Sequence, residues 1–221
     1  MDGVLAGHRE LTEPGVARTL TAALLPSDLL FVASSMPVRD VEWYGSPAMA
    51  CAVAANRGAN GIDGLVSTAL GAAAGRTGAW TVALLGDLAF LHDAGGLLGA
   101  ARRGVDCCYV VVDNDGGGIF GFLPQGGLPA EQFERLWATP HGVELPALAA
   151  VHGIPAVTLD GAAALTGALD DARQAGGVRL VHVRTDRAAN VAVHDELTAA
   201  VARALEGEVR AARPRRAAPG A

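Results

Sequence analysis

WTVALLGD at residues 80–87 and CCYVVVDN at residues 107–114 share one design, a continuous apolar run that ends in polar residues. Continuous apolar runs, as opposed to alternating ones, are typical of strands that are buried on both faces of a sheet. We therefore expect strands at 80–85 and 107–112, joined by a helical crossover. Such a crossover makes the strands parallel and places Asp87 and Asn114 at the same edge of the sheet.

The same alternation of apolar runs and helical segments extends along most of the chain. It predicts an α/β fold, with a doubly wound, mainly parallel sheet and helices on both faces. The expected bounds of this domain are 14–206, after a lead-in at 1–13 and before a disordered tail at 207–221. Further strands are expected at 29–33, 50–55, 157–159 and 179–184, and helices at 14–25, near 37–43, at 64–75, 90–103, 131–137, 145–152, 161–175 and 190–206.

The composition restricts the class of protein. Of 221 residues, 51% are hydrophobic and 18% are charged, which supports a buried core and argues against a disordered chain. The net charge is −6 and no basic stripe precedes the tail, so we expect no nucleic-acid partner. Three cysteines without a C-x-x-C spacing indicate packing thiols in a reducing compartment and no zinc site. We find neither a membrane span nor a signal peptide, and we expect a cytoplasmic protein.

Polar and glycine-rich residues gather where the expected strands end. In doubly wound sheets, ligands bind outside the carboxyl ends of the strands. This rule selects four loops, at Ser34–Arg39, Asn56–Gly64, Gly86–Phe90 and Asp113–Leu123.

Two of these loops carry oxygen ligands for a small hard cation. Asp87 offers a carboxylate, Asn114 an amide oxygen, and Gly116 a backbone carbonyl that no side chain obstructs. Three protein oxygens suit Mg²⁺, which completes its octahedron with water and phosphate. The helix that opens near Leu88 and Ala89 would aim free N–H groups at a diphosphate. Asp87 alone would more often be a helix cap, so the prediction depends on the joint spacing.

Gly86-Asp87 followed 27 positions later by Asn114 resembles the signature of thiamine-diphosphate enzymes, in which the Asp, the Asn and a nearby carbonyl hold the metal. The typical signature has Gly-Asp-Gly and paired asparagines, whereas this chain has Leu88 and Asp113. The flanking loops resemble one family, the menaquinone-pathway 2-succinyl-5-enolpyruvyl-6-hydroxy-3-cyclohexene-1-carboxylate synthases (MenD). The similarity spans about 14–184, and its motifs are Ser35–Asp40, Asn56–Gly64, Gly86–Asp93, Gly116–Pro124 and Thr139–Gly142.

This resemblance implies a transferase that uses thiamine diphosphate with Mg²⁺, or alternatively Mn²⁺. Such an enzyme decarboxylates 2-oxoglutarate and adds the resulting succinic semialdehyde carbanion to isochorismate. Both substrates carry several carboxylates, for which arginine is a suitable partner.

The resemblance also assigns roles residue by residue. It implies that the metal is held by Asp87, Asn114 and Gly116, and that the cofactor contacts these three together with Ile62, Gly86, Leu88, Ala89 and Ile119. It implies substrate contacts from Ser35, Arg39, Arg57, Phe120 and Leu123. Ser34 stands where asparagine is common in the family. His92 and His141 are more often structural than catalytic in such positions.

The resemblance covers only the last of the family's three domains. The first domain supplies the glutamate that activates the cofactor, so we expect no catalytic residue here and a need for a missing N-terminal pyrimidine-binding domain. The carboxylates ahead of the first strand, Asp2, Glu10, Glu13 and Asp28, lie in a lead too short for such a domain. We expect the full enzyme to be a homo-oligomer, with its active site between domains of different subunits.

Three alternatives stay open. The chain could be a non-catalytic cofactor-binding remnant, or a domain of another thiamine-diphosphate decarboxylase or acetolactate-synthase-like enzyme. A nucleotide-binding Rossmann domain is disfavoured because the first loop reads Ser34-Ser35-Met36-Pro37, without G-x-G-x-x-G.

Overall fold

The computed structural model describes residues 1–56 and 59–212, and its centre is one six-stranded sheet with the order β2-β1-β3-β4-β6-β5. All strand pairs in this described part are parallel, which confirms the expected fold class. The chain moves outward from β1 to β2 and then returns to the other side of β1 with β3, so the winding reverses between β1 and β3. The strands are β1 Leu29–Val32, β2 Ala52–Ala54, β3 Thr81–Gly86, β4 Cys107–Asp113, β5 Ala156–Thr158 and β6 Val178–Arg184.

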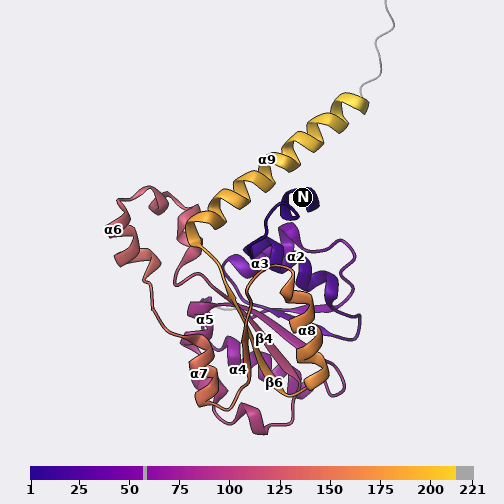
Figure 1. Cartoon of the computed structure of the whole chain (residues 1–221), viewed down its shortest axis with the longest axis vertical. Helices are drawn as coiled ribbons and strands as arrows, with labels where there is room; N and C mark the ends of the chain where they lie inside the picture. The colour runs from indigo at the N-terminus through magenta and orange to yellow at the C-terminus, as the bar shows by residue number, and fades with distance from the viewer. Residues whose placement is uncertain (57–58, 213–221) are drawn as a thin grey trace, which may run out of the picture.

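Helices cover both faces of the sheet, as Figure 1 shows. α4, α5 and α7 pack on one face, whereas α2 and α8 pack on the other. The long helix α9 extends beyond the body of the domain (Figure 1). The helices are α1 Asp2–Leu5, α2 Glu13–Ala23, α3 Met36–Tyr44, α4 Leu65–Gly75, α5 Asp87–His92, α6 Ala130–Phe133, α7 Leu145–Val151, α8 Ala164–Ala175 and α9 Arg187–Ala212.

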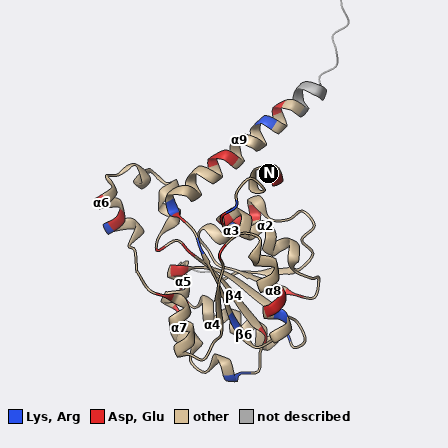
Figure 2. Cartoon of the chain, in the orientation of Figure 1, with Lys and Arg blue, Asp and Glu red and all other residues tan. Residues whose placement is uncertain are grey.

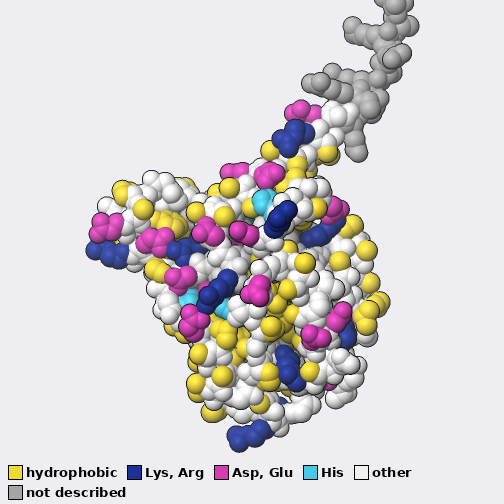
Figure 3. Space-filling view, viewed as in Figure 1, with side chains coloured by type: hydrophobic (Ala, Val, Ile, Leu, Met, Phe, Trp, Pro, Cys, Tyr) yellow, Lys and Arg dark blue, Asp and Glu magenta, His cyan; other side chains and the backbone are white. Residues whose placement is uncertain are grey.

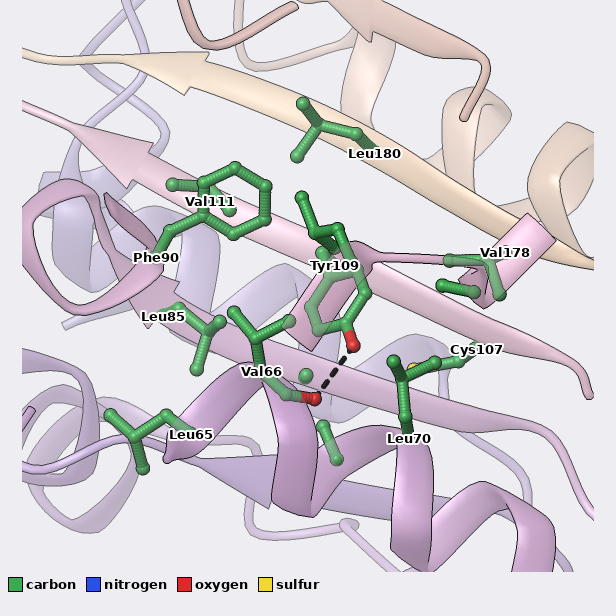
Figure 4. Packing of buried hydrophobic residues seen from close by; sticks show 14 of the residues in the cluster. Leu65, Val66, Leu70, Leu85, Phe90, Cys107, Tyr109, Val111, Val178 and Leu180 are labelled. Carbon is green, nitrogen blue, oxygen red and sulfur yellow. Dashed lines mark hydrogen bonds between the residues drawn. The ribbon is translucent and has the colours of Figure 1, made fainter. Parts of the chain in front are cut away.

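The central strand β4 shows why the strands of this sheet have continuous apolar sequences. Cys107, Tyr109 and Val111 point into the cluster beneath α4, while Cys108 and Val110 point into the cluster beneath α8. Neither face meets water, so every position along β4 before Asp113 is buried. Figure 4 shows Tyr109 in the first cluster, where its hydroxyl donates a 2.8 Å hydrogen bond to the carbonyl of Val66. That bond satisfies the one polar atom that this large side chain brings into the core.

The predicted helix over 90–103 is wrong. α5 begins at Asp87, directly after β3, and ends at His92. A Cβ on Gly96 would lie 2.5 Å from the Ser67 Oγ of α4, so the close packing here requires glycine. Because glycine is a poor helix former, the chain continues in two short 3₁₀ turns, Ala94–Leu97 and Ala100–Arg102.

The described parts of both terminal segments contain more helix than the sequence suggested. The expected loose lead-in contains α1, whose Val4 and Leu5 pack against Tyr44, Val193 and Leu197. α9 continues to Ala212, six residues beyond its expected end at 206, so the tail predicted as disordered is helical over 207–212. The remainder of that tail, 213–221, lies outside the described residues.

The charged side chains are spread over the described surface. Figure 2 places acidic and basic residues along α9, α6 and α8, and Figure 3 shows both signs interspersed on the face in view. None of the described helices combines the length and the apolar character needed to cross a bilayer. Cys51, Cys107 and Cys108 are free thiols, as expected.

Candidate functional site

A cavity of about 220 Å³ lies at the carboxyl ends of β1, β3 and β4, beside the point where the winding of the sheet reverses. This is the position at which doubly wound sheets bind ligands. All four loops selected from the sequence contribute to the cavity lining, the Asn56–Gly64 loop through Ile62. The lining includes Ser35, Gly86–Ala89, Asn114 and Gly116–Phe120.

Asp87 is a buried carboxylate in the lining of this cavity, and its residue is 3% exposed. The N–H groups of Gly116 and Leu88 donate to its two oxygens, at 2.7 and 2.6 Å. Burial raises the pKa of Asp87, although these two N–H groups act in the opposite direction. The Leu88 N–H is therefore engaged by Asp87 and not free for an anion, contrary to expectation. The contact of Ala89 with a diphosphate stays a prediction.

One polar atom of the Asn114 side chain has a hydrogen-bond partner, and the other has none in the described part of the chain, so we call it the orphan atom. Its Nδ2 donates a 2.7 Å hydrogen bond to Glu13 Oε1, whereas its Oδ1 is buried without a partner among the described residues. Buried amide oxygens without a partner are rare, and an absent ion is one of the explanations for them. The orphan oxygen lies in the cavity lining beside Asp87 and Gly116, so it fits a ligand role.

The backbone of Gly116 has a conformation that residues with a side chain rarely adopt. Its φ is 138°, and a Cβ would lie 2.1 Å from the carbonyl oxygen of Ala138. Asp115, just before it, has a φ of 57°. Two consecutive residues with positive φ turn the chain sharply, which lets the Gly116 N–H reach Asp87. The Gly116 carbonyl accepts from the Gly118 N–H at 3.0 Å and keeps a second lone pair for a cation.

Glu13 is a site residue that the sequence did not reveal. It stands in the first turn of α2, is 5% exposed, and lines the same cavity. Burial raises the pKa of Glu13 to about 7, with the hydrogen bond from Asn114 acting in the opposite direction. The sequence showed Glu13 only as one of the carboxylates ahead of the first strand, and nothing in the spacing connects α2 with the loop after β4.

His141 was expected to be structural, and the structure places it beside the carboxylates. Its Nε2 lies 3.3 Å from Asp87 Oδ2 and 3.6 Å from Asp113 Oδ1. Asp113 is held from behind by the buried His182, whose Nε2 lies 2.7 Å from Asp113 Oδ2. Asp113 is half-buried, yet the His182 hydrogen bond lowers the pKa of Asp113. Asp87, Asp113 and His141 bring one ligand atom each within 4.8 Å of one another, so these three side chains could also hold a metal ion.

The predicted substrate residues are only partly brought together. Ser35 lines the cavity with a φ of 72°, a strained value for a side chain and a feature that clusters at functional sites. Arg39 Nη1 donates a 2.6 Å hydrogen bond to the Ser35 carbonyl. Phe120 lines the cavity and its ring lies 5.2 Å from that of Trp137, but Leu123 is 44% exposed and outside the lining. Arg57 falls outside the described residues.

Two further features lie away from the cavity. His92 is half-exposed beside Asp63, with 3.6 Å between Nδ1 and Oδ1, and it does not line the cavity. A larger hollow of about 830 Å³ is lined by Arg184, Arg187 and Asn114 among others, but Asp87 is not part of its lining. The smaller cavity is therefore the one that unites the three predicted metal ligands.

Comparisons with known proteins find related chains. The family model described as "Thiamine pyrophosphate enzyme, C-terminal TPP binding domain" matches residues 38–183. A 2-succinyl-5-enolpyruvyl-6-hydroxy-3-cyclohexene-1-carboxylate synthase from Myxococcus xanthus is 48% identical over 200 residues, which cover 88% of this chain and 33% of that protein. The synthase of the same name from Thermobifida fusca is 45% identical, covering 92% and 36%. The chain thus spans about a third of the length of these relatives.

The fold is also found among solved structures. A chain from Mycobacterium smegmatis, described as a thiamin diphosphate-dependent enzyme, superimposes with a TM-score of 0.62 at 22% identity. The superposition covers 80% of this chain and 32% of that one. At this identity the likeness supports the fold alone.

Proposed function

The chain belongs to the family of C-terminal TPP-binding domains of thiamine pyrophosphate enzymes, and on that premise we propose that it holds thiamine diphosphate through Mg²⁺ in a menaquinone-pathway carboligase. The orphan Asn114 Oδ1, buried in one cavity with Asp87 and Gly116, is the observation that carries this proposal. Mn²⁺ would fit the same oxygens.

The cavity suits the diphosphate end of the cofactor. Gly86 has open space where a Cβ would stand, so its backbone leaves room for a bound group. Asp87, Asn114 and Gly116 would supply the three protein oxygens of the cation, whose remaining positions are left to phosphate and water. Ile62, Ile119 and Phe120 add apolar surface to the same cavity, against which the cofactor would rest.

The arginines predict how the substrates would bind. When bound, thiamine diphosphate supplies the electron sink for decarboxylation of a 2-oxo acid and for carbon–carbon bond formation. Ser35, Arg39 and Arg57 would bind the carboxylates of 2-oxoglutarate and isochorismate, since a guanidinium matches a planar carboxylate. Leu123, exposed in this chain, would contact substrate once a second surface covers it.

The activating glutamate would come from an N-terminal pyrimidine-binding domain that this sequence does not include. Within the proposal, the domain comprises 14–206, and the complete enzyme pairs it with that partner in a homo-oligomer. A non-catalytic remnant would bind the cofactor equally well, so binding and turnover need separate tests.

Binding is tested by titrating thiamine diphosphate into the chain with and without Mg²⁺, followed by calorimetry. We expect saturable binding that requires the metal. Binding of equal strength in excess chelator would refute the proposed metal site.

Turnover is tested by mixing the chain with the part of the Myxococcus xanthus synthase that it does not match, plus cofactor, Mg²⁺ and isochorismate. We expect carbon dioxide release from 2-oxoglutarate and not from pyruvate. Release from pyruvate would favour an acetolactate-synthase-like enzyme, and release from neither would favour the remnant.

A further inference from the structure

We call the part of the cavity that is lined by Asp87, Asn114 and Gly116 the metal end. Two side chains from distant parts of the chain form hydrogen bonds with Glu13 there. Its Oε1 accepts hydrogen bonds from Asn114 Nδ2 at 2.7 Å and from Thr185 Oγ1 at 3.2 Å. Thr12 caps the start of α2 by accepting from the Gly15 N–H, and this fixes where the first turn lies. Glu13 also lies outside the residues that the family model matches, 38–183.

The chemistry of this contact sets the orientation of the Asn114 amide. An asparagine amide can turn by 180° with little change in shape, which exchanges a donor for an acceptor. Glu13 Oε1 accepts hydrogen bonds from both Asn114 Nδ2 and Thr185 Oγ1, and a carboxyl oxygen that carries no proton can only accept, so the amide group that faces it is NH₂. The amide oxygen then points the other way, and that oxygen is the buried orphan.

The space around the amide is equally restricted. A Cβ on Gly118 would lie 2.5 Å from Asn114 Nδ2, so this glycine leaves room for the NH₂ group in its observed place. If the amide were turned, the NH₂ hydrogens would face the cation and the oxygen would face the Glu13 carboxylate. Both contacts would be repulsive.

We propose that Glu13 is a positioning residue for the metal, which orients the Asn114 amide so that its oxygen faces the cation. The inference rests on the proposed function for the identity of the cation. It differs from the role of an activating glutamate, because Glu13 is buried against Asn114 and Thr185 at the metal end.

Two substitutions of Glu13 by residues of similar size distinguish a role in orienting Asn114 from a role in packing. Glu13→Gln keeps an oxygen that can accept from Asn114, whereas Glu13→Met fills the space without an acceptor. We expect Glu13→Met to raise the Mg²⁺ concentration for half-maximal thiamine diphosphate binding roughly 10–100-fold, the usual range for residues that orient metal ligands. Glu13→Gln should stay within about threefold of the unchanged chain. The melting temperature should not follow this order, because removing a buried carboxylate can also stabilise a fold.

A second measurement follows the amide itself. The chain has four asparagines, so ¹⁵N-asparagine labelling gives few side-chain signals, and Asn114→Ala identifies the relevant one. We expect Glu13→Met to shift this signal strongly and Glu13→Gln to shift it little. Equal Mg²⁺ requirements for both variants, or an Asn114 signal unmoved by Glu13→Met, would overturn the proposal.

The same data separate this inference from the function on which it rests. If the unchanged chain binds no thiamine diphosphate with Mg²⁺, the proposed function fails. The Asn114 signal would still show whether Glu13 sets the amide orientation.

Discussion

The two ends of the proposed site differ in how far this chain completes them. At the metal end, Asp87 and Asn114 are bonded to Gly116, Leu88 and Glu13 of the same chain. The proposed substrate residues Arg39 and Leu123, which we call the substrate end, lie outside the cavity lining: Arg39 donates a hydrogen bond to the Ser35 carbonyl, and Leu123 faces solvent. The proposed cofactor site would thus be built within one domain, whereas the proposed substrate contacts would need surfaces from outside it.

This comparison makes different predictions for variants at each end. Changes at the metal end should affect cofactor binding in the isolated chain. Changes at the substrate end should have an effect only when the chain works with its partner domain. The following variants are ordered from the largest expected effect to the smallest.

Asp87→Asn should have the largest effect. It preserves the shape of the side chain but removes the charge that the cation needs, and we expect thiamine diphosphate binding with Mg²⁺ to fall by at least about 100-fold. Calorimetry measures this directly. Asp171→Asn, at an exposed position of α8, is the matched control and should bind as the unchanged chain does. Similar losses in both variants would mean that net charge, and not the site, governs binding.

Gly116→Ala tests whether the metal end is fixed by its backbone. The new Cβ would meet the Ala138 carbonyl at a φ of 138°, so we expect a loss of about 3 kcal/mol in the free energy of unfolding. Urea denaturation measures it. Gly71→Ala, in α4 with open space around its Cβ, should instead be neutral or stabilise by up to about 1 kcal/mol. Tolerance of alanine at 116 would show that the turn is adaptable.

Arg39→Ala should leave the metal end intact. We expect thiamine diphosphate binding within about twofold of the unchanged chain, and a KM for 2-oxoglutarate raised roughly tenfold in the mixture with the partner domain, since a charged hydrogen bond contributes about 1.5–3 kcal/mol. Steady-state kinetics and calorimetry together check it. Arg76→Ala, on the surface at the end of α4, is the control. Loss of cofactor binding in Arg39→Ala would assign this arginine a structural role.

His194 gives the smallest effect, a pH dependence of stability. Its Nδ1 lies 2.8 Å from the Asn190 carbonyl and its Nε2 lies 2.7 Å from Asp40 Oδ1, so both ring nitrogens face acceptors. Burial disfavours the charged ring, but the hydrogen bond with Asp40 outweighs it and raises the pKa of His194. The stabilisation is then complete below the unfolded pKa near 6.5, and it is lost as the pH rises through the higher folded pKa.

We expect the free energy of unfolding to fall as the pH rises above about 6.5, by less than the loss in Gly116→Ala. His194→Gln should reduce this fall. It should not affect a second fall from Glu13: burial raises the pKa of Glu13 from 4.5 to about 7, so this contribution to stability is lost between these two pH values, mostly below the range in which His194 acts. Urea denaturation across the pH range checks both points, and an unchanged slope in His194→Gln would contradict the assignment.

The sequence predicted what depends on short-range pattern. Apolar runs located all six strands, and the spacing from Asp87 to Asn114 correctly placed these two residues in one cavity, because both follow from the geometry of a parallel sheet. Features that depend on tertiary packing could not be predicted from the sequence pattern. The helix after β3 stops at His92 because Gly96 packs closely against α4, and no local signal gives that distance.

Residues contributed from distant segments were the main omission. Glu13 precedes Asn114 by 101 positions, and His141 follows Asp87 by 54. No motif links Glu13 to the cavity, and the Thr139–Gly142 motif that contains His141 does not show that this residue lies beside Asp87. A carboxylate in the first turn of a helix was the single available signal for Glu13, and its partner could not be named without the fold. The role of His141 beside Asp87 stays a prediction.

The most direct measurement is the position of the cation. A crystal structure of the chain with thiamine diphosphate and Mn²⁺ would locate the ion from its anomalous signal. The account predicts an ion within coordination distance of Asp87, Asn114 Oδ1 and the Gly116 carbonyl. An ion held by Asp113 and His141, with Asn114 Oδ1 outside its coordination sphere, would contradict it.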